Sequence, residues 1–155
     1  MEVVVATPFQ VIVDFAHTPN AIDKALRATR TMTKKRLIHV FGSAGLRDVT
    51  KRPLMGRASS KYADVIVLTE EDYRTESVEK IMDEIAVGIE GYKEVHRYAN
   101  RRDAITFALG VARAGDIVII TGKGHEQSLC RGRKEYPWSD QREALKLMKD
   151  MQKTV

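Results

Sequence analysis

Short apolar runs rich in β-branched residues alternate along the chain with longer segments whose apolar positions recur at helical spacing. Four runs have the length and composition of buried strands, and they lie at residues 11–14, 36–41, 64–69 and 116–121. Four segments place apolar side chains three and four positions apart and predict amphipathic helices, at residues 19–28, 53–62, 78–89 and 100–113. This alternation predicts an α/β fold with a doubly wound, mostly parallel, Rossmann-like sheet and helices on both faces.

The C-terminal part of the chain departs from this alternation. Residues 131–133 (Arg-Gly-Arg) lie between short extended pieces, which predicts a hairpin. Ser139 then begins a last amphipathic helix that runs to Met151. We therefore expect a C-terminal hairpin and helix to be added to the doubly wound sheet.

The length of 155 residues, with 43% apolar and 30% charged residues, fits one compact domain. The chain has neither ~20 consecutive apolar residues nor a signal-peptide pattern, so we expect a cytoplasmic protein without a membrane partner. The single cysteine, Cys130, is expected to be a bystander. Because few residues precede the first predicted strand, the chain is either a natural small protein or one domain cut from a larger one.

The net charge of +5 raises the possibility of a nucleic-acid partner. However, the basic residues are spread over several segments, aromatic residues make up only 6%, and no helix-turn-helix or RNA-binding signature occurs. An anionic small substrate explains the charge equally well, and we expect no nucleic-acid partner.

Charged and imidazole side chains follow the predicted strands directly. In a doubly wound sheet, ligands bind beyond the carboxyl ends of the strands, so these side chains are expected to converge. They occur in four loops, at residues 14–19, 42–48, 70–75 and 122–126.

Residue chemistry alone leaves alternatives open in the first two loops. Asp14 could accept hydrogen bonds from a ribose diol and His17 could contact a phosphate, or the two could be a helix cap and a turn histidine. Arg47 and Lys51 suit a carboxylate or phosphate, or form a solvated basic loop. The second loop is not a phosphate loop, because Gly-x-x-x-x-Gly-Lys-Ser/Thr is absent from the chain.

The third and fourth loops combine charges of both signs. Arg74 follows three acids, including Asp72, and could help bind an amino acid at both ends or form a self-paired surface turn. The loop Gly-Lys-Gly-His-Glu at 122–126 is more specific, because two glycines let the backbone approach a ligand beside a cation, a titratable ring and an anion.

These loops together resemble a known family. The segments that carry the resemblance to the C-terminal domain of MurE-type Mur ligases are residues 14–20 (Asp-Phe-Ala-His-Thr-Pro-Asn), 45–56 (Gly-Leu-Arg-Asp-Val-Thr-Lys-Arg-Pro-Leu-Met-Gly), 122–126 and 139–142 (Ser-Asp-Gln-Arg). The resemblance covers nearly the whole chain, in order. It implies a single Mur ligase C-terminal domain over residues 1–155, with the N-terminal UDP-binding and central ATPase domains absent from this chain.

The resemblance also implies an ATP-dependent, amide-forming ligase of peptidoglycan precursor synthesis. Such an enzyme joins a diamino acid to UDP-N-acetylmuramoyl-L-alanyl-D-glutamate through an acyl phosphate. The phosphate loop and the Mg²⁺ ligands belong to the central domain, which would act in cis or in trans, so we expect no metal ligand or catalytic residue here and an inactive isolated chain. The implied nucleotide contacts are Asp14, His17 and Asn20, and the implied amino-acid contacts are Arg47, Lys51, Asp72, Arg74, Gly122 and Glu126.

The third loop departs from the family pattern. Diaminopimelate-adding members carry Asp-Asn-Pro-Arg where this chain has Glu71-Asp-Tyr-Arg74, so Asp72 replaces a neutral amide while Arg74 is kept. The added amino acid is therefore left open at this point. Two other functions remain alternatives: a standalone nucleotide or amino-acid binding module, and a domain of a folylpolyglutamate synthetase-like ligase.

Overall fold

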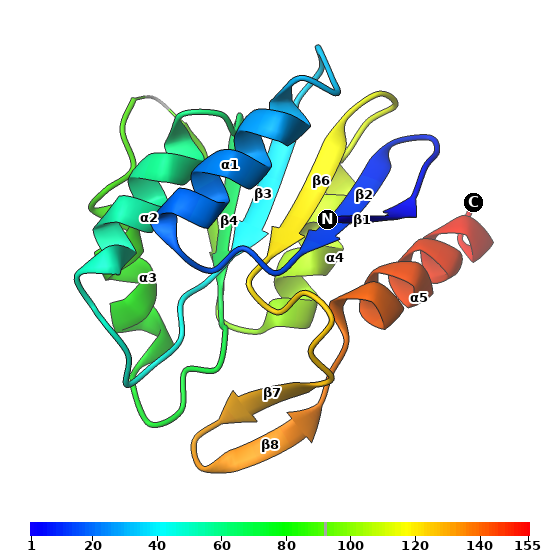
Figure 1. Ribbon diagram of the computed structural model, residues 1–155. Coiled ribbons are helices and arrows are strands. Elements are labelled where there is room, and N and C mark those ends of the chain that lie inside the picture. Colours follow the sequence, from blue (N-terminus) through cyan, green and yellow to red (C-terminus); the bar gives the residue numbers. More distant parts are fainter. Residues whose placement is uncertain (92) are drawn as a thin grey trace.

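Figure 1 shows the computed structural model, which describes residues 1–91 and 93–155. Its centre is a six-stranded sheet that lies between two layers of helices. The sheet contains β1 (Glu2–Val5), β2 (Gln10–Asp14), β3 (Leu37–Phe41), β4 (Val65–Thr69), β5 (Glu94–Tyr98) and β6 (Ile117–Thr121). The helices are α1 (Pro19–Arg30), α2 (Lys51–Ser60), α3 (Val78–Ala86), α4 (Arg101–Val111) and α5 (Asp140–Lys153). A separate hairpin is formed by β7 (Ser128–Arg131) and β8 (Lys134–Pro137).

The strand order is β1-β2-β6-β3-β4-β5, and every neighbouring pair except β1 with β2 is parallel. The predicted doubly wound, mostly parallel sheet is therefore confirmed. This order brings the carboxyl ends of β2, β6, β3 and β4 to one edge of the sheet, side by side.

Apolar side chains on both faces of the strands hold the layers together. Successive residues of a strand point to opposite faces, so Ile12 packs under α1 and α2, while Val11 and Val13 pack under α4 and α5. Helices α1, α2 and α3 cover the first face, and α4 and α5 cover the second. Both layers bury the strands, which accounts for the near-continuous apolar runs in the sequence.

The predicted strands are confirmed with boundaries shifted by at most one residue, but two edge strands were not predicted. β5 has the charged sequence Glu-Val-His-Arg-Tyr, in which Val95, His96 and Tyr98 are half-buried and the other two residues are exposed. It therefore lacks the apolar run of a central strand. β1 pairs antiparallel with β2 and is half exposed. Helix α2 begins at Lys51, two residues before the predicted start at Pro53.

The predicted C-terminal hairpin and helix are also confirmed. The hairpin lies beyond the carboxyl ends of the central strands, and α5 returns along the sheet toward β1 (Figure 1). Ser139 accepts a hydrogen bond from the Arg142 amide and so caps α5. In the described part of the chain, no helix has both the length and the apolar character that crossing a membrane requires.

Candidate functional site

The first loop, after β2, presents polar and aromatic groups beside the start of α1. Oδ1 of Asp14 accepts a hydrogen bond from the Ala16 amide at 2.8 Å, and Oδ2 lies 3.0 Å from the N-terminal amino group. Thr18, rather than Asp14, caps α1 by accepting a bond from the Ala21 amide. Asp14 is therefore not the helix cap that the sequence left as an alternative.

His17 belongs to a small exposed aromatic group. Its Nδ1 is 2.9 Å from the carbonyl oxygen of Phe15, and the two rings lie 4.6 Å apart. Phe15 is 42% exposed, and its ring lies 5.9 Å from that of His125 in the fourth loop. Nζ of Lys51 donates to the carbonyl oxygen of His17 at 3.1 Å, which places Lys51 beside the predicted nucleotide residues.

The second loop, after β3, packs against the third loop. Gly45 donates to the carbonyl oxygen of Asp72, and a Cβ at this position would lie 2.0 Å from the Tyr73 oxygen, so only glycine fits. Arg47 and Asn20 are both exposed, and the described residues give the Arg47 guanidinium no hydrogen-bond partner. Neither residue is drawn into the contacts among the third and fourth loops.

Asp72 in the third loop is bonded on both of its carboxylate oxygens. Nζ of Lys123 lies 2.8 and 2.9 Å from the two oxygens, and the Cys130 amide of β7 donates to Oδ1 at 2.8 Å. Burial opposes the charge on Asp72, but these hydrogen bonds outweigh it and lower the pKa of the carboxyl group. Asp72 therefore joins the third loop to the fourth loop and to the hairpin.

Arg74 takes a left-handed backbone conformation with φ of 52°. Its Nη1 donates to the carbonyl oxygen of Gly45 at 2.8 Å, and its backbone forms an isolated bridge with Arg131. Arg74 thus contacts the second loop through its side chain and the hairpin through its backbone.

The fourth loop, after β6, is built around close backbone approaches. Gly122 has φ of 112°, and a Cβ here would meet the Glu71 carboxylate at 2.5 Å. Gly124 has φ of 54° and packs against Phe15 in the same way. Nζ of Lys123, which is 1% exposed, also lies 2.6 Å from Glu126. Burial lowers the pKa of Lys123, but the bonds to Asp72 and Glu126 outweigh this and raise it.

Two buried groups in this region were not assigned roles from the sequence. Glu71 is 7% exposed, and its Oε2 has no hydrogen-bond partner among the described residues. Burial is the largest cause that raises the pKa of Glu71 to about 7. Arg101 is fully buried and binds both carboxylate oxygens of Asp140 at 2.8 Å, which fixes the start of α5 to the sheet edge. Arg101 and Asp140 lie 39 positions apart in the sequence, so local spacing gave no signal for this ion pair.

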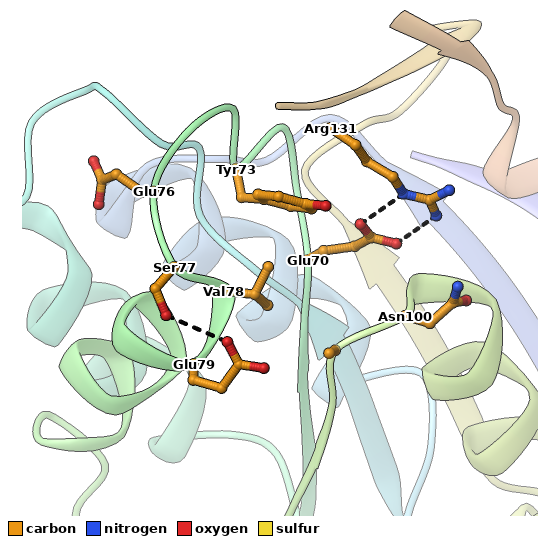
Figure 2. A pocket seen from close by; sticks show the side chains of 9 residues that line it. Glu70, Tyr73, Glu76, Ser77, Val78, Glu79, Asn100 and Arg131 are labelled. Carbon is orange, nitrogen blue, oxygen red and sulfur yellow. Dashed lines mark hydrogen bonds and ion pairs between the residues drawn. The ribbon is translucent and has the colours of Figure 1, made fainter. Parts of the chain in front are cut away.

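A pocket lies at this edge between the third loop and the start of α4. It holds about 560 Å³ and is bordered by Tyr73, by Asn100 and by the ion pair between Glu70 and Arg131 (Figure 2). Arg131 binds the Glu70 carboxylate through two nitrogens, at 2.6 and 2.9 Å, and so anchors the hairpin. The predicted site residues do not line this pocket. One of them, Asn20, borders another pocket of about 350 Å³ between α1 and α2.

The structure thus brings Asp72, Arg74, Gly122 and Glu126 together across the third and fourth loops, and it sets Lys51 beside Asp14 and His17. The presence of anionic, cationic and imidazole groups at the carboxyl edge of the sheet fits a ligand-binding domain of the α/β class.

Comparison with known proteins defines this class further. Residues 1–124 match the family model for the Mur ligase, glutamate ligase domain, and the chain belongs to the Mur ligase family. A UDP-N-acetylmuramoyl-L-alanyl-D-glutamate–2,6-diaminopimelate ligase of Aquifex aeolicus is 48% identical over 90% of this chain and 29% of its own length. A UDP-N-acetylmuramyl-tripeptide synthetase of a Roseiflexus species is 42% identical over 93% of this chain and likewise 29% of its own length. The chain therefore spans less than a third of these relatives.

Solved structures give the same result for the fold. A structure of UDP-N-acetylmuramoyl-L-alanyl-D-glutamate–2,6-diaminopimelate ligase superposes with a TM-score of 0.93 at 35% identity, over 98% of this chain and 31% of that one. Escherichia coli FolC in complex with ADP superposes with a TM-score of 0.62 at 17% identity, over 99% of this chain and 32% of that one. At that identity the second likeness shows the fold alone.

Proposed function

We propose that this chain is the amino-acid-binding, closing domain of an ATP-dependent ligase that adds a diamino acid to UDP-N-acetylmuramoyl-L-alanyl-D-glutamate in the cytoplasm. The observation that carries the proposal is the identity of 48% over 90% of the chain to a diaminopimelate ligase. The convergence of Arg74, Gly122 and Glu126 at the sheet edge supports it, since a diamino acid offers both carboxylates and ammonium groups.

The amino-acid side of the site would work through charge. In this proposal Arg47 and Arg74 bind the carboxylates of the diamino acid, while Glu126 and the Gly122 backbone hold an ammonium group. Arg74 is pre-positioned by its bond to Gly45, whereas Arg47 is exposed and free to follow a ligand. Retention of Arg74 favours an amino acid with a second carboxylate, and so favours diaminopimelate over lysine.

The nucleotide side would be formed by Asp14, His17 and Asn20, with Lys51 close by. His17 and Lys51 suit an anionic group, because His17 directly precedes Thr18, the N-cap of α1, and the Lys51 ammonium lies 3.1 Å from the His17 carbonyl. The described residues contain no group of three His, Cys, Asp or Glu side chains that could hold a metal ion. As the resemblance to the Mur ligases implies, we assign the Mg²⁺ ligands to the central domain of the ligase.

In this division of labour, the chain contributes position and charge. The phosphate-loop motif does not occur in the sequence, so ATP cleavage is assigned to a central domain that acts in cis or in trans. Closure of this domain would bring the amine of the diamino acid to the activated carboxylate and exclude water.

A chimera tests the proposal. The chain replaces the matching C-terminal segment of the Aquifex aeolicus relative, and ADP formation is measured with UDP-N-acetylmuramoyl-L-alanyl-D-glutamate and either meso-diaminopimelate or L-lysine. We expect amide formation with meso-diaminopimelate and no reaction with the 155-residue chain alone. A folded chimera that binds ATP and the dipeptide substrate but ligates neither diamino acid would refute the proposal.

Calorimetry of the 155-residue chain separates this function from a standalone binding module. Affinity for ATP or meso-diaminopimelate that is too weak to measure fits one wall of a divided site. Micromolar binding by the chain alone would favour the module.

A further inference from the structure

Lys123 is a buried cation in the middle of the fourth loop. Its side chain is 1% exposed, yet its ammonium lies within 2.9 Å of both oxygens of Asp72 and within 2.6 Å of Glu126. A buried ammonium is costly unless it is paired, so these two carboxylates account for its placement.

The carboxylates of Asp72 and Glu126 differ in whether an oxygen remains available to bind a ligand. In Asp72, both oxygens contact Lys123, and Oδ1 also accepts the Cys130 amide. Glu126 lies 2.6 Å from Lys123 through Oε2, its Oε1 accepts no hydrogen bond from the described residues, and its side chain is 40% exposed. Within the described residues, Glu126 is therefore the member of the pair with an uncommitted oxygen at the surface.

The backbone on both sides of Lys123 is fixed. Gly122 lies against the Glu71 carboxylate, and Gly124 lies against the backbone and ring of Phe15. Because neither approach leaves room for a Cβ, the stem of Lys123 leaves the loop from a set position. The ammonium, in turn, sets the position of the Glu126 carboxylate.

We propose that Lys123 is a positioning residue that holds Glu126 ready for the ammonium of the incoming amino acid, and that Asp72 is its counter-charge rather than a substrate ligand. This inference rests on the proposed function. The three side chains carry one positive and two negative charges, so the group keeps a net negative charge that is exposed at Glu126. A neutral residue at position 72 would cancel that charge.

The test compares variants of the ligase chimera by their KM for meso-diaminopimelate, their KM for ATP and their kcat. Lys123→Gln should raise the KM for meso-diaminopimelate by about tenfold or more, which corresponds to about 1.4 kcal/mol of binding, with the KM for ATP unchanged within twofold. Lys123→Arg, which keeps the charge, should restore part of the loss. Lys146→Gln, on the exposed face of α5, is the matched control and should change neither constant.

A neutral pair separates positioning from structural support. In the 155-residue chain, Lys123→Gln alone should destabilise the fold and speed exchange of the Cys130 amide, because Asp72 loses its buried partner. Adding Asp72→Asn should recover stability in urea unfolding. In the chimera, the same double variant should keep the raised KM for meso-diaminopimelate, because Glu126 remains unpositioned.

The outcomes are distinct from those for the function itself. If the chimera ligates meso-diaminopimelate and Lys123→Gln leaves its KM unchanged, the role of Lys123 is wrong and the function stands. If the KM returns to the parent value whenever stability returns, Lys123 is merely structural. If the unmodified chimera does not ligate at all, the proposed function fails first.

Discussion

Around the first loop, Phe15 and Asn20 are exposed and the His17 ring makes a single local hydrogen bond. By contrast, Lys123 in the fourth loop and Glu71 in the third are buried, with Lys123 paired to Asp72 and Glu71 lying against Gly122. The amino-acid side of the proposed site is thus preformed by ion pairs and close backbone approaches. The nucleotide side has fewer such contacts, and its Asn20 borders a pocket of about 350 Å³ between α1 and α2. In the proposed function, these preformed charges would receive the amino acid when the domain closes, whereas the nucleotide would be held mainly by the central domain.

The largest effect on stability should come from breaking the buried ion pair between Arg101 and Asp140, which fixes the start of α5. Arg101→Met leaves the fully buried carboxylate of Asp140 without its partner, and we expect a loss of about 3–5 kcal/mol of unfolding free energy in urea. Arg102→Met is the matched control. Arg102 pairs with Glu143 at 3.5 Å and is 46% exposed, so its loss should cost at most ~1 kcal/mol. Equal losses of unfolding free energy in the two variants would contradict the view that buried ion pairs hold the carboxyl edge of the sheet in place.

The next effect depends on pH and involves Glu71. Folding raises the pKa of Glu71 from 4.5 to about 7, so the folded chain binds more protons than the unfolded chain between these values, and stability is lost as pH rises through them. Glu71→Gln removes this loss. The variant should gain on the wild type with a slope of about 1.4 kcal/mol per pH unit from pH 4.5 to 7, measured by urea unfolding.

A buried histidine, His39, gives stability the opposite dependence on pH from Glu71. His39 in β3 bonds Ser59 and Thr121, and burial lowers its pKa to about 3. Its contribution to stability is therefore lost as pH falls below about 6.5. In the wild type the two slopes oppose each other between pH 4.5 and 6.5. A pH-independent difference between Glu71→Gln and wild type would show that the carboxyl group titrates normally.

A smaller effect is expected at the glycine that lies against Glu71. Gly122→Ala adds a Cβ 2.5 Å from the carboxylate at a φ of 112°, and we expect a loss of about 1–3 kcal/mol in urea unfolding. Gly110→Ala in α4 is the matched control, because nothing lies within 4 Å of its added Cβ and alanine favours a helix. Its stability should be unchanged or slightly higher. A harmless Gly122→Ala would mean that the fourth loop is not held as tightly as its contacts indicate.

The separation in sequence between contacting residues explains which features the sequence could predict. Strands such as β6 and the loop after each strand follow from local pattern, because an apolar run and the residues at its carboxyl end are adjacent in the chain. The links from Lys123 to Asp72 and from Arg101 to Asp140 join residues 51 and 39 positions apart, so no local spacing marks them. Edge strand β5 was missed for another reason, since a strand that is only half covered keeps charged residues.

The smallest effect on stability should accompany a selective effect on the nucleotide. Lys51→Met removes an ammonium whose hydrogen bond is to the His17 carbonyl, a partly solvated contact, so unfolding free energy should change by no more than ~0.5 kcal/mol. In the ligase chimera, the KM for ATP should rise severalfold while the KM for meso-diaminopimelate stays within twofold, because Lys51 donates its hydrogen bond to the first loop and none to Asp72, Lys123 or Glu126. Lys24→Met, on the exposed side of α1, is the control for loss of charge alone. If Lys51→Met instead raised the KM for the amino acid, the two halves of the edge would not be separate, and Lys51 would belong with Arg74 and Glu126.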